Sequence, residues 1–380
     1  MINVGITGMK NKSLDKFKGC LIGGAVGDAL GYAVEFLNIE QIKKFHGEKG
    51  ITEYELIDGK ALISDDTQMT LFTANGLLLG TTRGMIRGMF CSYPYYIWLC
   101  YKDWLKTQEP CDEQPNAEYA WLYNVPELNH SRAPGNTCLS AIAQDKCGTI
   151  QEPINNSKGC GGLMRVAPIG LYFIDKWDSQ DVIDMLGAEA AALTHGHELG
   201  YIPAALLVHI ISLVSSGTTS LEDAIQDGLK SIVTLFPSAN ELNNFIGIIN
   251  KAVYLSKCDF DDLSAISQLG EGWVAEETLA IAIYCSLKYQ KDFEKAIIAA
   301  VNHSGDSDST GSVTGNILGA YLGINAIPDK FIKNLELKDL IEDIATDLFN
   351  DCKASEFDPY IDVIWVSKYI HHDYNFKPNN

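Results

Sequence analysis

Two short acidic stretches carry the residue types best suited to metal chemistry. Residues 64–67 read SDDT and come directly before an apolar helical run, so their simplest interpretation is an N-cap with carboxylates at the positive end of a helix. Residues 303–311 read HSGDSDSTG and place Asp306 and Asp308 two positions apart in a turn. This second stretch lacks the frame and terminal Glu of an EF-hand, and a capped turn is its simplest interpretation too.

Taken together, the two stretches offer four carboxylates and two hydroxyls without any Cys or His ligand. Such oxygen donors suit hard divalent ions, Mg²⁺ or Mn²⁺, rather than zinc or copper. Four carboxylates held close together would repel one another strongly, which favours two cations about 3.5–4 Å apart. This interpretation requires that the two stretches meet in the folded chain. The candidate metal ligands are Ser64, Asp65, Asp66, Asp306, Asp308 and Ser309.

Loops between the two stretches are candidates for binding a ligand. Residues 157–165 (SKGCGGLMR) form a glycine-rich loop whose backbone N–H groups could approach a diphosphate, and Arg165 could add positive charge. The loop matches neither the Walker A pattern nor GxGxxG after a strand, which disfavours a nucleoside triphosphatase or a dehydrogenase. His195 and His197 are two positions apart and would not share a helix face, so capping or core roles are more usual, although His195 could lie near a ligand.

Helical periodicity dominates the chain, and alternating strand-like runs are few. We therefore expect an all-α fold with one domain over residues 14–370, a loosely held N-terminal arm over 1–13 and a polar tail over 371–380. The aromatic segment 93–104 fits a buried helix better than a base-stacking platform. The clearest helical patterns cover residues 181–193, 202–214, 276–288 and 293–301.

Glycine recurs every four residues in two places, which needs a reason because glycine inside a helix costs about 1 kcal/mol relative to alanine. The spacing puts each set on one helix face and permits close backbone approach. We expect two buried helices that each pack tightly on a neighbour, and the two helices could pack on each other. Gly31 could instead be a turn. The two sets are Gly19, Gly23, Gly27 and Gly31, and Gly311, Gly315, Gly319 and Gly323.

Composition limits the partners of this chain of 380 residues. Its 49 acidic and 29 basic residues give a net charge of −20, which disfavours nucleic acid and anionic membranes. The 10 cysteines show no C-x-x-C pair, so free thiols in a reducing cytoplasm are expected. The N-terminus lacks the apolar region of a secretory signal, and the most apolar stretch, 201–214, is too short to span a bilayer.

In this order, the motifs resemble the ADP-ribosylglycohydrolase family, which includes the dinitrogenase reductase-activating glycohydrolase and ADP-ribosylarginine hydrolases. The resemblance extends from about Phe17 to Gly323. Several independent matches at wide separations carry it, whereas one motif alone would not. The matching segments are 19–36 (GCLIGGAVGDALGYAVEF), 64–73 (SDDTQMTLFT), 135–137 (GNT), 158–170 (KGCGGLMRVAPIG), 193–200 (LTHGHELG) and 303–311 (HSGDSDSTG).

The resemblance implies an all-α fold with a centre of two Mg²⁺ or Mn²⁺ ions, held by the six ligands named above. Glu35 matches an acid near the substrate ribose, and Glu35, Asp65 or Asp306 would take the proton of the attacking water. Other matching positions line the ADP-ribose cleft. These positions are Asn136, Gly159, Gly161, Gly162, Met164, Arg165 and His195.

The implied activity is hydrolysis of the N-glycosidic bond of ADP-ribosylated protein side chains. Residues 306–309 read DSDS, which resembles the arginine-specific branch, whereas the serine- or polymer-cleaving branch usually ends this motif in Thr. Ser64 stands where many relatives have Thr, and it keeps the hydroxyl. The alternatives are hydrolysis of serine-linked or other ADP-ribose compounds, and a non-catalytic relative that keeps the fold as a binding or structural protein. A third alternative is neutralisation of an ADP-ribosyltransferase toxin, both by binding it through residues 1–13 and by reversing its damage.

Overall fold

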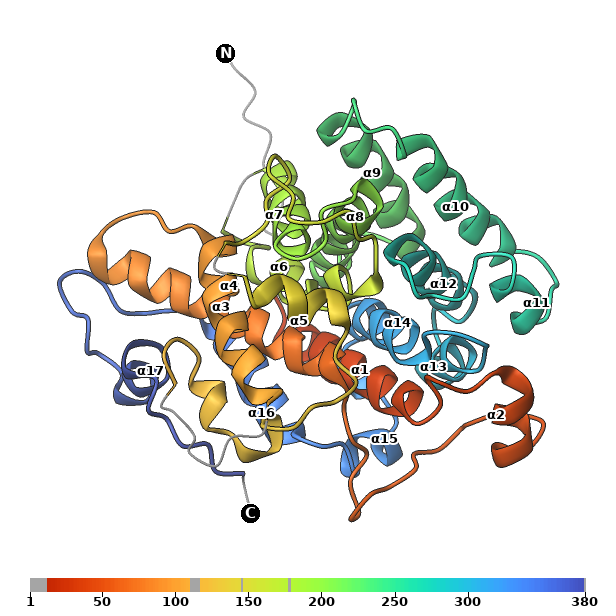
Figure 1. Ribbon diagram of the computed structural model, residues 1–380, viewed down its shortest axis with the longest axis horizontal. Coiled ribbons are helices and arrows are strands. Elements are labelled where there is room, and N and C mark those ends of the chain that lie inside the picture. The colour runs from red at the N-terminus through yellow and green to blue at the C-terminus, as the bar shows by residue number, and fades with distance from the viewer. Residues whose placement is uncertain (1–11, 110–116, 145, 177–178, 379–380) are drawn as a thin grey trace.

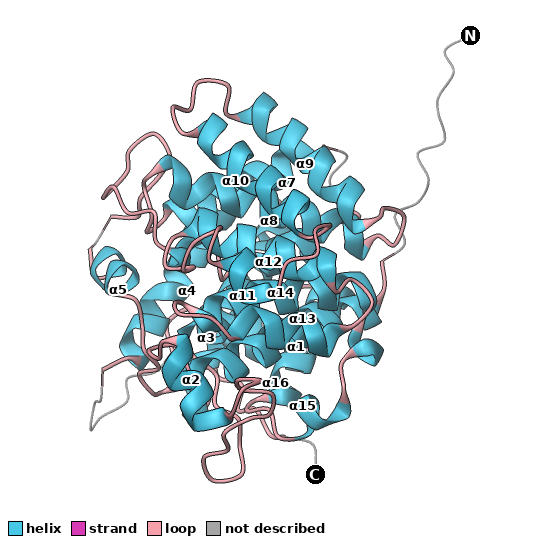
Figure 2. Ribbon diagram, turned by 90° about the vertical axis from the view of Figure 1, so that its right-hand side faces the viewer, coloured by secondary structure: helices cyan, strands magenta, loops and turns pink. Residues whose placement is uncertain are grey.

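A computed structural model describes residues 12–109, 117–144, 146–176 and 179–378. Helices and their connections make up this part of the chain, and Figure 2 shows no strand in it. Isolated bridges, such as the one between Gly159 and Val274, are the only β-type pairings among the described residues. The expected all-α fold is confirmed.

Seventeen α-helices follow one another in the described residues. Their bounds are α1 Leu14–Tyr32, α2 Ile39–His46, α3 Asp65–Arg87, α4 Tyr93–Thr107, α5 Asn136–Ile142, α6 Ala167–Tyr172, α7 Gln180–Ala192, α8 Glu198–Ser215, α9 Leu221–Leu235, α10 Leu242–Leu255, α11 Asp262–Ile266, α12 Ala275–Lys288, α13 Phe293–Val301, α14 Ser307–Leu322, α15 Asp329–Lys333, α16 Lys338–Asn350 and α17 Val363–Val366.

The two glycine-striped helices, α1 and α14, pack against each other in antiparallel orientation at the centre of the molecule (Figure 1). A Cβ atom added to Gly27 would lie 2.0 Å from the carbonyl oxygen of Gly311, so neither helix could carry a side chain there. The expected close packing is confirmed, and the two helices are each other's partner. The facing pairs are Gly19 with Gly319, Gly23 with Gly315, and Gly27 with Gly311.

Gly31 continues this interface, and its interpretation as a turn is wrong. It lies inside α1, where an added Cβ would be 2.3 Å from the carbonyl oxygen of Ser307 and 2.5 Å from the Cα atom of Asp308. The last glycine of α1 therefore lets the first residues of α14 approach the end of α1. This contact brings the second acidic stretch close to the segment that carries Glu35.

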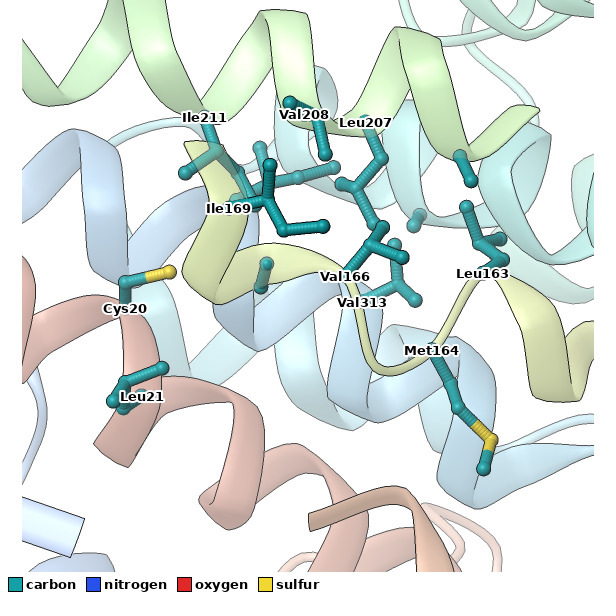
Figure 3. Packing of buried hydrophobic residues seen from close by; sticks show 14 of the residues in the cluster. Cys20, Leu21, Leu163, Met164, Val166, Ile169, Leu207, Val208, Ile211 and Val313 are labelled. Carbon is teal, nitrogen blue, oxygen red and sulfur yellow. The ribbon is translucent and has the colours of Figure 1, made fainter. Parts of the chain in front are cut away.

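The four clearest predicted helices correspond to α7, α8, α12 and α13. Helix α8 begins four residues earlier than predicted, because the His197 side chain accepts a hydrogen bond from the backbone N–H of Leu199 (3.0 Å) and caps the helix. Leu207 and Val208 of α8 lie close to Val166 and Ile169 in the core (Figure 3). Helix α8 is long and apolar enough to cross a membrane. However, 89% of its 18-residue stretch is buried inside the protein.

Structure is described for only part of the predicted arm and tail. Residues 1–11 of the arm lie outside the described residues, as do 379 and 380 of the tail. Within the tail, the ring of Tyr374 packs edge-on against Trp121, with 5.2 Å between the ring centroids. The side-chain amide of Asn124 also donates to the carbonyl oxygen of His372 (2.8 Å). These contacts tie the start of the tail to the helical body.

The glycine interface makes a prediction about stability. Gly315→Ala should lower the free energy of unfolding by about 2–3 kcal/mol, because its Cβ would lie 1.9 Å from the carbonyl oxygen of Gly23. Gly247→Ala is the matched control, since Gly247 lies in α10 with open space around its Cβ position. That change should raise stability by up to about 1 kcal/mol. Urea unfolding checks both, and equal effects would contradict the close-packing account.

Candidate functional site

The first acidic stretch forms the N-terminus of α3, as its sequence predicts. Ser64 is the N-cap, and its hydroxyl accepts a hydrogen bond from the backbone N–H of Asp66 (3.2 Å). Asp65 and Asp66 occupy the first turn and are almost fully buried. The positive end of the helix dipole favours carboxylates at these positions.

Asp28, an acid that the sequence analysis did not select, fixes this helix start from α1. Its buried carboxylate accepts hydrogen bonds from the backbone N–H groups of Ser64 (3.0 Å) and Thr67 (3.0 Å), and from the Thr67 hydroxyl. Burial raises the pKa of Asp28 to about 6 against the lowering effect of these hydrogen bonds. Asp28 is therefore a positioning residue that ties α3 to the glycine-striped helix.

The second acidic stretch forms the N-terminus of α14. Asp306 is the N-cap and accepts a hydrogen bond from the backbone N–H of Ser309 (3.3 Å), which Asp308 also accepts (2.9 Å). Gly305 precedes it with φ of 148°, a conformation that favours glycine, and an added Cβ would lie 2.0 Å from the carbonyl oxygen of Glu271. The turn thus sets the direction in which the Asp306 carboxylate enters the site.

The two stretches meet in the folded chain, as the metal hypothesis requires. The Ser309 hydroxyl donates to one carboxylate oxygen of Asp66 across 3.3 Å, although the residues are 243 positions apart. The other oxygen of Asp66 is buried without a hydrogen-bond partner among the described residues, and so is Oε2 of Glu35. We call these residues the acid cluster, which consists of Glu35, Ser64, Asp65, Asp66, Asp306, Asp308 and Ser309.

Burial and mutual repulsion raise the pKa values of the carboxyl groups in the acid cluster. Burial, followed by repulsion from Asp308 and Asp65, raises the pKa of Glu35 to about 9. Burial raises the pKa of Asp306 to about 6, and burial with repulsion from Asp308 raises the pKa of Asp66 well above its usual value. Negative charge accumulated here is therefore unfavourable without protons or cations.

The acid cluster fits divalent cations in donor chemistry and charge. Its oxygen donors are those that Mg²⁺ and Mn²⁺ prefer, and within the described part of the chain one oxygen each of Asp66 and Glu35 is buried without a hydrogen-bond partner. Within the described residues, however, no three His, Cys, Asp or Glu side chains are already gathered as a metal site. Asp306 and Asp308 instead point oxygens at the N–H of Ser309, so ion binding would require these side chains to rotate.

The glycine-rich loop lies directly beside the acid cluster. The thiol of Cys160 donates to the carboxylate of Asp306 (2.8 Å), a contact that the sequence analysis missed. On the other side, the N–H of Gly135 points at the carboxylate of Asp65 (3.4 Å) and places the adjoining Asn136 at the exposed start of α5. Asn136 and the loop thus lie on the same side of the molecule as the acids.

His195 lies beneath the glycine-rich loop and explains part of its composition. Added Cβ atoms on Gly159, Gly161 and Gly162 would each lie 3.2–3.3 Å from the His195 side chain. Its Nδ1 pairs with the Thr194 hydroxyl (2.8 Å), and burial with the nearby Arg165 charge lowers its pKa to about 3. His195 therefore lies near the glycine-rich loop, as a buried and neutral imidazole on which the loop packs.

Arg165 and Met164 are turned into the protein rather than toward solvent. The Arg165 guanidinium is fully buried and donates to the carbonyl oxygen of Ala190 (3.2 Å) and the Thr194 hydroxyl (2.7 Å). Its central carbon lies 4.4 Å from the centre of the Tyr101 ring. Met164 is also buried, with its sulfur 3.9 Å from the Ser309 hydroxyl. Arg165 therefore holds Thr194, the hydrogen-bond partner of His195, whereas Met164 lies against the acid cluster.

An exposed aromatic pair stands beside the acid cluster. The rings of Phe36 and Trp273 stack with 6.5 Å between centroids and an angle of 21°. Phe36 directly follows Glu35, and the carbonyl oxygen of Trp273 accepts a hydrogen bond from the N–H of Cys160 (3.2 Å). No spacing in the sequence could reveal this pair, because its two members are far apart in the chain.

Comparison with known proteins agrees with this arrangement. The family model for ADP-ribosylglycohydrolase matches residues 9–356. The chain belongs to the ADP-ribosylglycohydrolase family. A solved structure of an ADP-ribosylglycohydrolase-related protein complex has the same fold, with a TM-score of 0.53 and 24% identity over 89% of this chain and 98% of that chain.

Two curated relatives in this comparison are named for different activities. ADP-ribosylhydrolase ARH3 of Mus musculus is 25% identical, covering 86% of this chain and 88% of that protein. ADP-ribosylarginine hydrolase Tri1 of Pseudomonas putida (strain GB-1) is 23% identical, covering 89% of this chain and 79% of that protein. Membership of the family shows that the protein is a glycohydrolase. Because the two sequence identities are similar, they do not decide which side-chain linkage to ADP-ribose is cleaved.

Asp28 provides a test of how the helix start is held. Asp28→Asn should lower the free energy of unfolding by about 2–3 kcal/mol, because an amide cannot accept all the hydrogen bonds that the carboxylate takes from Ser64 and Thr67. The exposed Asp358→Asn is the control and should have little effect. Urea unfolding measures the free energy of unfolding of both variants. An Asp28→Asn variant as stable as the unaltered protein would refute the positioning role.

His195 makes a prediction about acid stability. Its pKa is about 3 in the folded protein against a reference value of 6.5, so the unfolded chain binds more protons below pH 6.5. Its contribution to stability is therefore complete above pH 6.5 and is lost progressively as pH falls toward 3. Unfolding curves from pH 7 to 4 should show a shallower loss of stability in His195→Gln than in the unaltered protein. Parallel curves would contradict a buried neutral imidazole.

Proposed function

We propose that this protein is a metal-dependent hydrolase that releases ADP-ribose from modified protein side chains, with ADP-ribosylarginine as the preferred linkage. The observation that carries the proposal is the meeting of the α3 and α14 termini, where Ser309 contacts Asp66 beside Glu35. A buried set of carboxylates with free oxygens suits both cation binding and a cationic transition state. The family supports hydrolysis of an ADP-ribose bond.

Two Mg²⁺ or Mn²⁺ ions would be held by six of the seven residues of the acid cluster. Glu35 is the residue that is not a metal ligand. When bound, such ions supply positive charge that orients ribose hydroxyls and makes a water molecule more acidic. We infer that the Glu35 carboxylate, with its unpartnered Oε2, faces the ribose and removes the proton from the attacking water. Asp65 and Asp306 are the other candidates for this role.

In the proposed reaction, water attacks C1″ of the ribose while the bond from C1″ to the side-chain nitrogen breaks. The sugar passes through an oxocarbenium-like state, whose positive charge the surrounding carboxylates stabilise. The carboxylate base takes a proton from the water, and the departing guanidine keeps the bonding electron pair. This proton then passes from the base to the guanidine, which becomes guanidinium and leaves the carboxylate ionised again. The products are ADP-ribose and unmodified arginine.

The glycine-rich loop is the proposed binding place of the diphosphate. Gly159 and Gly161 are partly exposed, and their lack of side chains allows close approach of an anion to backbone N–H groups. Asn136 lies across the site and can donate to a ribose or phosphate oxygen. His195 and Arg165 would act as positioning residues, because both are buried under the loop.

Two observations support arginine as the linkage. Residues 306–309 read DSDS, and the net charge of −20 favours approach of the cationic segments in which arginine is common. Serine-linked ADP-ribose is the second candidate, because ADP-ribosylhydrolase ARH3 of Mus musculus, whose name specifies no arginine linkage, is similar to this chain to the same degree. The hydroxyl leaving group of serine would need a proton donor that a guanidinium does not need.

The decisive experiment incubates the protein with arginine-linked and serine-linked mono-ADP-ribosyl peptides, in Mg²⁺, Mn²⁺ or chelator. We expect metal-dependent release of ADP-ribose from the arginine-linked peptide, with kcat lowered about 100-fold or more in Asp306→Asn. The exposed Asp358→Asn should remain fully active. Calorimetric titration with Mn²⁺ should show weaker binding in Asp306→Asn but not in the control.

The possible outcomes separate the parts of the proposal. Release from the serine-linked peptide alone would overturn the arginine assignment and leave the catalytic site intact. Release from neither peptide, with metal binding retained, would indicate a non-catalytic relative. Full metal-dependent activity in Asp306→Asn would refute the assignment of this ligand.

A further inference from the structure

A cysteine thiol lies among the oxygen donors of the acid cluster. The Sγ atom of Cys160 is 2.8 Å from Oδ2 of Asp306, which accepts its hydrogen bond. The two residues are 146 positions apart, so this contact is a product of the fold. The function proposed above gives the thiol no role, although it touches one of the proposed metal ligands.

A second carboxylate of the acid cluster lies near the same sulfur. Burial, followed by the charges of Asp306 and Asp66, raises the pKa of Cys160 well above its usual value, which shows that both carboxylates are close to the thiol. Asp66 is only 2% exposed, and its Oδ2 has no hydrogen-bond partner among the described residues. A buried oxygen without a partner beside a thiol is a pair of donors that a cation can satisfy.

Another sulfur atom borders the acid cluster on the side of the glycine-rich loop. The Sδ atom of Met164 is 3.9 Å from the Ser309 hydroxyl, which also donates to Asp66. Both sulfurs come from the short segment 160–164. Thiolate and thioether groups favour softer ions such as Zn²⁺, whereas carboxylates and hydroxyls alone suit Mg²⁺. The acid cluster therefore combines hard donors with soft neighbours.

The backbone holds the Cys160 thiol in place and leaves it within reach of solvent. The N–H of Cys160 donates to the carbonyl oxygen of Trp273 (3.2 Å), and Gly159 forms a bridge with Val274. Cys160 is partly exposed, as are the glycines on either side of it. An ion from solution can thus reach the sulfur without any opening of the helical core.

We propose that Cys160, Asp306 and Asp66 form a site for a divalent ion that prefers sulfur, with Zn²⁺ as its natural type and Cys160 as a direct ligand. The metal–sulfur bond forms as the thiol releases its proton to solvent, so Cys160 binds as a thiolate. This inference rests on the proposed function in one respect, namely that the acid cluster binds divalent ions.

The required movement is small. Zinc bonds of about 2.3 Å to sulfur and about 2.0–2.2 Å to oxygen, at a tetrahedral angle, place the two donors roughly 3.6 Å apart. Sγ of Cys160 and Oδ2 of Asp306 are 2.8 Å apart, so rotation of one side chain is sufficient. An ion bound in this way takes Asp306 away from Mg²⁺ or Mn²⁺ and inhibits the hydrolase.

The experiment uses Co²⁺ as the probe, because Zn²⁺ has a filled d shell and gives no d–d spectrum. A bond between cobalt and a thiolate produces a charge-transfer band in the near ultraviolet. The band is measured in the full chain, in Cys160→Ser and in Cys258→Ser. Cys258 is the matched control, since it is also partly exposed and its thiol donates to the carbonyl oxygen of Tyr254. Calorimetry measures the binding of Co²⁺, Zn²⁺ and Mg²⁺ to each protein.

We expect the band in the full chain and in Cys258→Ser, and no band in Cys160→Ser. Loss of the thiolate should weaken Zn²⁺ binding about tenfold or more, while Mg²⁺ binding should change less than about threefold because its oxygen ligands remain.

A second measurement needs no substitution at Cys160. Zn²⁺ should slow the labelling of Cys160 by a maleimide in the unaltered protein, as followed by mass spectrometry. Labelling of Cys258 should not change.

The results distinguish this proposal from the function on which it rests. Calorimetric binding of Co²⁺ without the band, or a band that persists in Cys160→Ser, would overturn the thiolate ligand and leave Mg²⁺-dependent hydrolysis untouched. Equal weakening of Zn²⁺ and Mg²⁺ in Cys160→Ser would also overturn it, because the thiol would then only position Asp306. Failure of every divalent ion to bind would overturn both this site and the metal-dependent hydrolase.

Discussion

The contact between the backbones of α1 and α14 determines where every acidic residue of the site can lie. Glycine pairs such as Gly27 with Gly311 let the carbonyl oxygen of one helix occupy the place of a side chain on the other. The end of α1 then reaches the start of α14 at Gly31, and Asp28 binds the start of α3 to the same helix. Three helix ends thus converge, and the separation between their carboxylates is set by the close packing of two helices that carry almost no side chains at their interface.

This convergence brings several carboxylates together, and their mutual repulsion is unfavourable. The same repulsion enables the site to attract positive charge. The positive ends of two helix dipoles partly offset it, because Asp66 and Asp308 lie in the first turns of α3 and α14. The dipoles cannot neutralise several buried carboxylates, as the raised pKa values of Asp66 and Glu35 show. The remaining repulsion favours cations and a cationic transition state over the unliganded site.

Local sequence signals predicted the two acidic stretches of the acid cluster because each stretch is local, whereas Glu35 was expected only from the family resemblance. A Ser followed by two acids before an apolar run is a helix start wherever it occurs, and Ser64 caps α3 as expected. The contact of Cys160 with Asp306 depends on tertiary packing and leaves no trace in spacing. Arg165 shows a further limit, since its position in a glycine-rich loop suggested contact with a phosphate. A sequence cannot tell that its side chain turns inward to stack on Tyr101.

Helix α3 connects the acid cluster to an apolar groove that is lined by the end of α3, the start of α4 and α7. Its first turn holds Asp65 and Asp66, and its last turns, near Met85, line the apolar groove. Along the helix axis, Asp66 is separated from Thr81, the first residue of α3 that lines the groove, by about 23 Å. The groove and the acids therefore do not share a surface, and any influence of one on the other would have to pass through movement of α3 as a rigid body. The anchoring of Ser64 and Thr67 by Asp28 opposes such movement, so the two surfaces should operate independently.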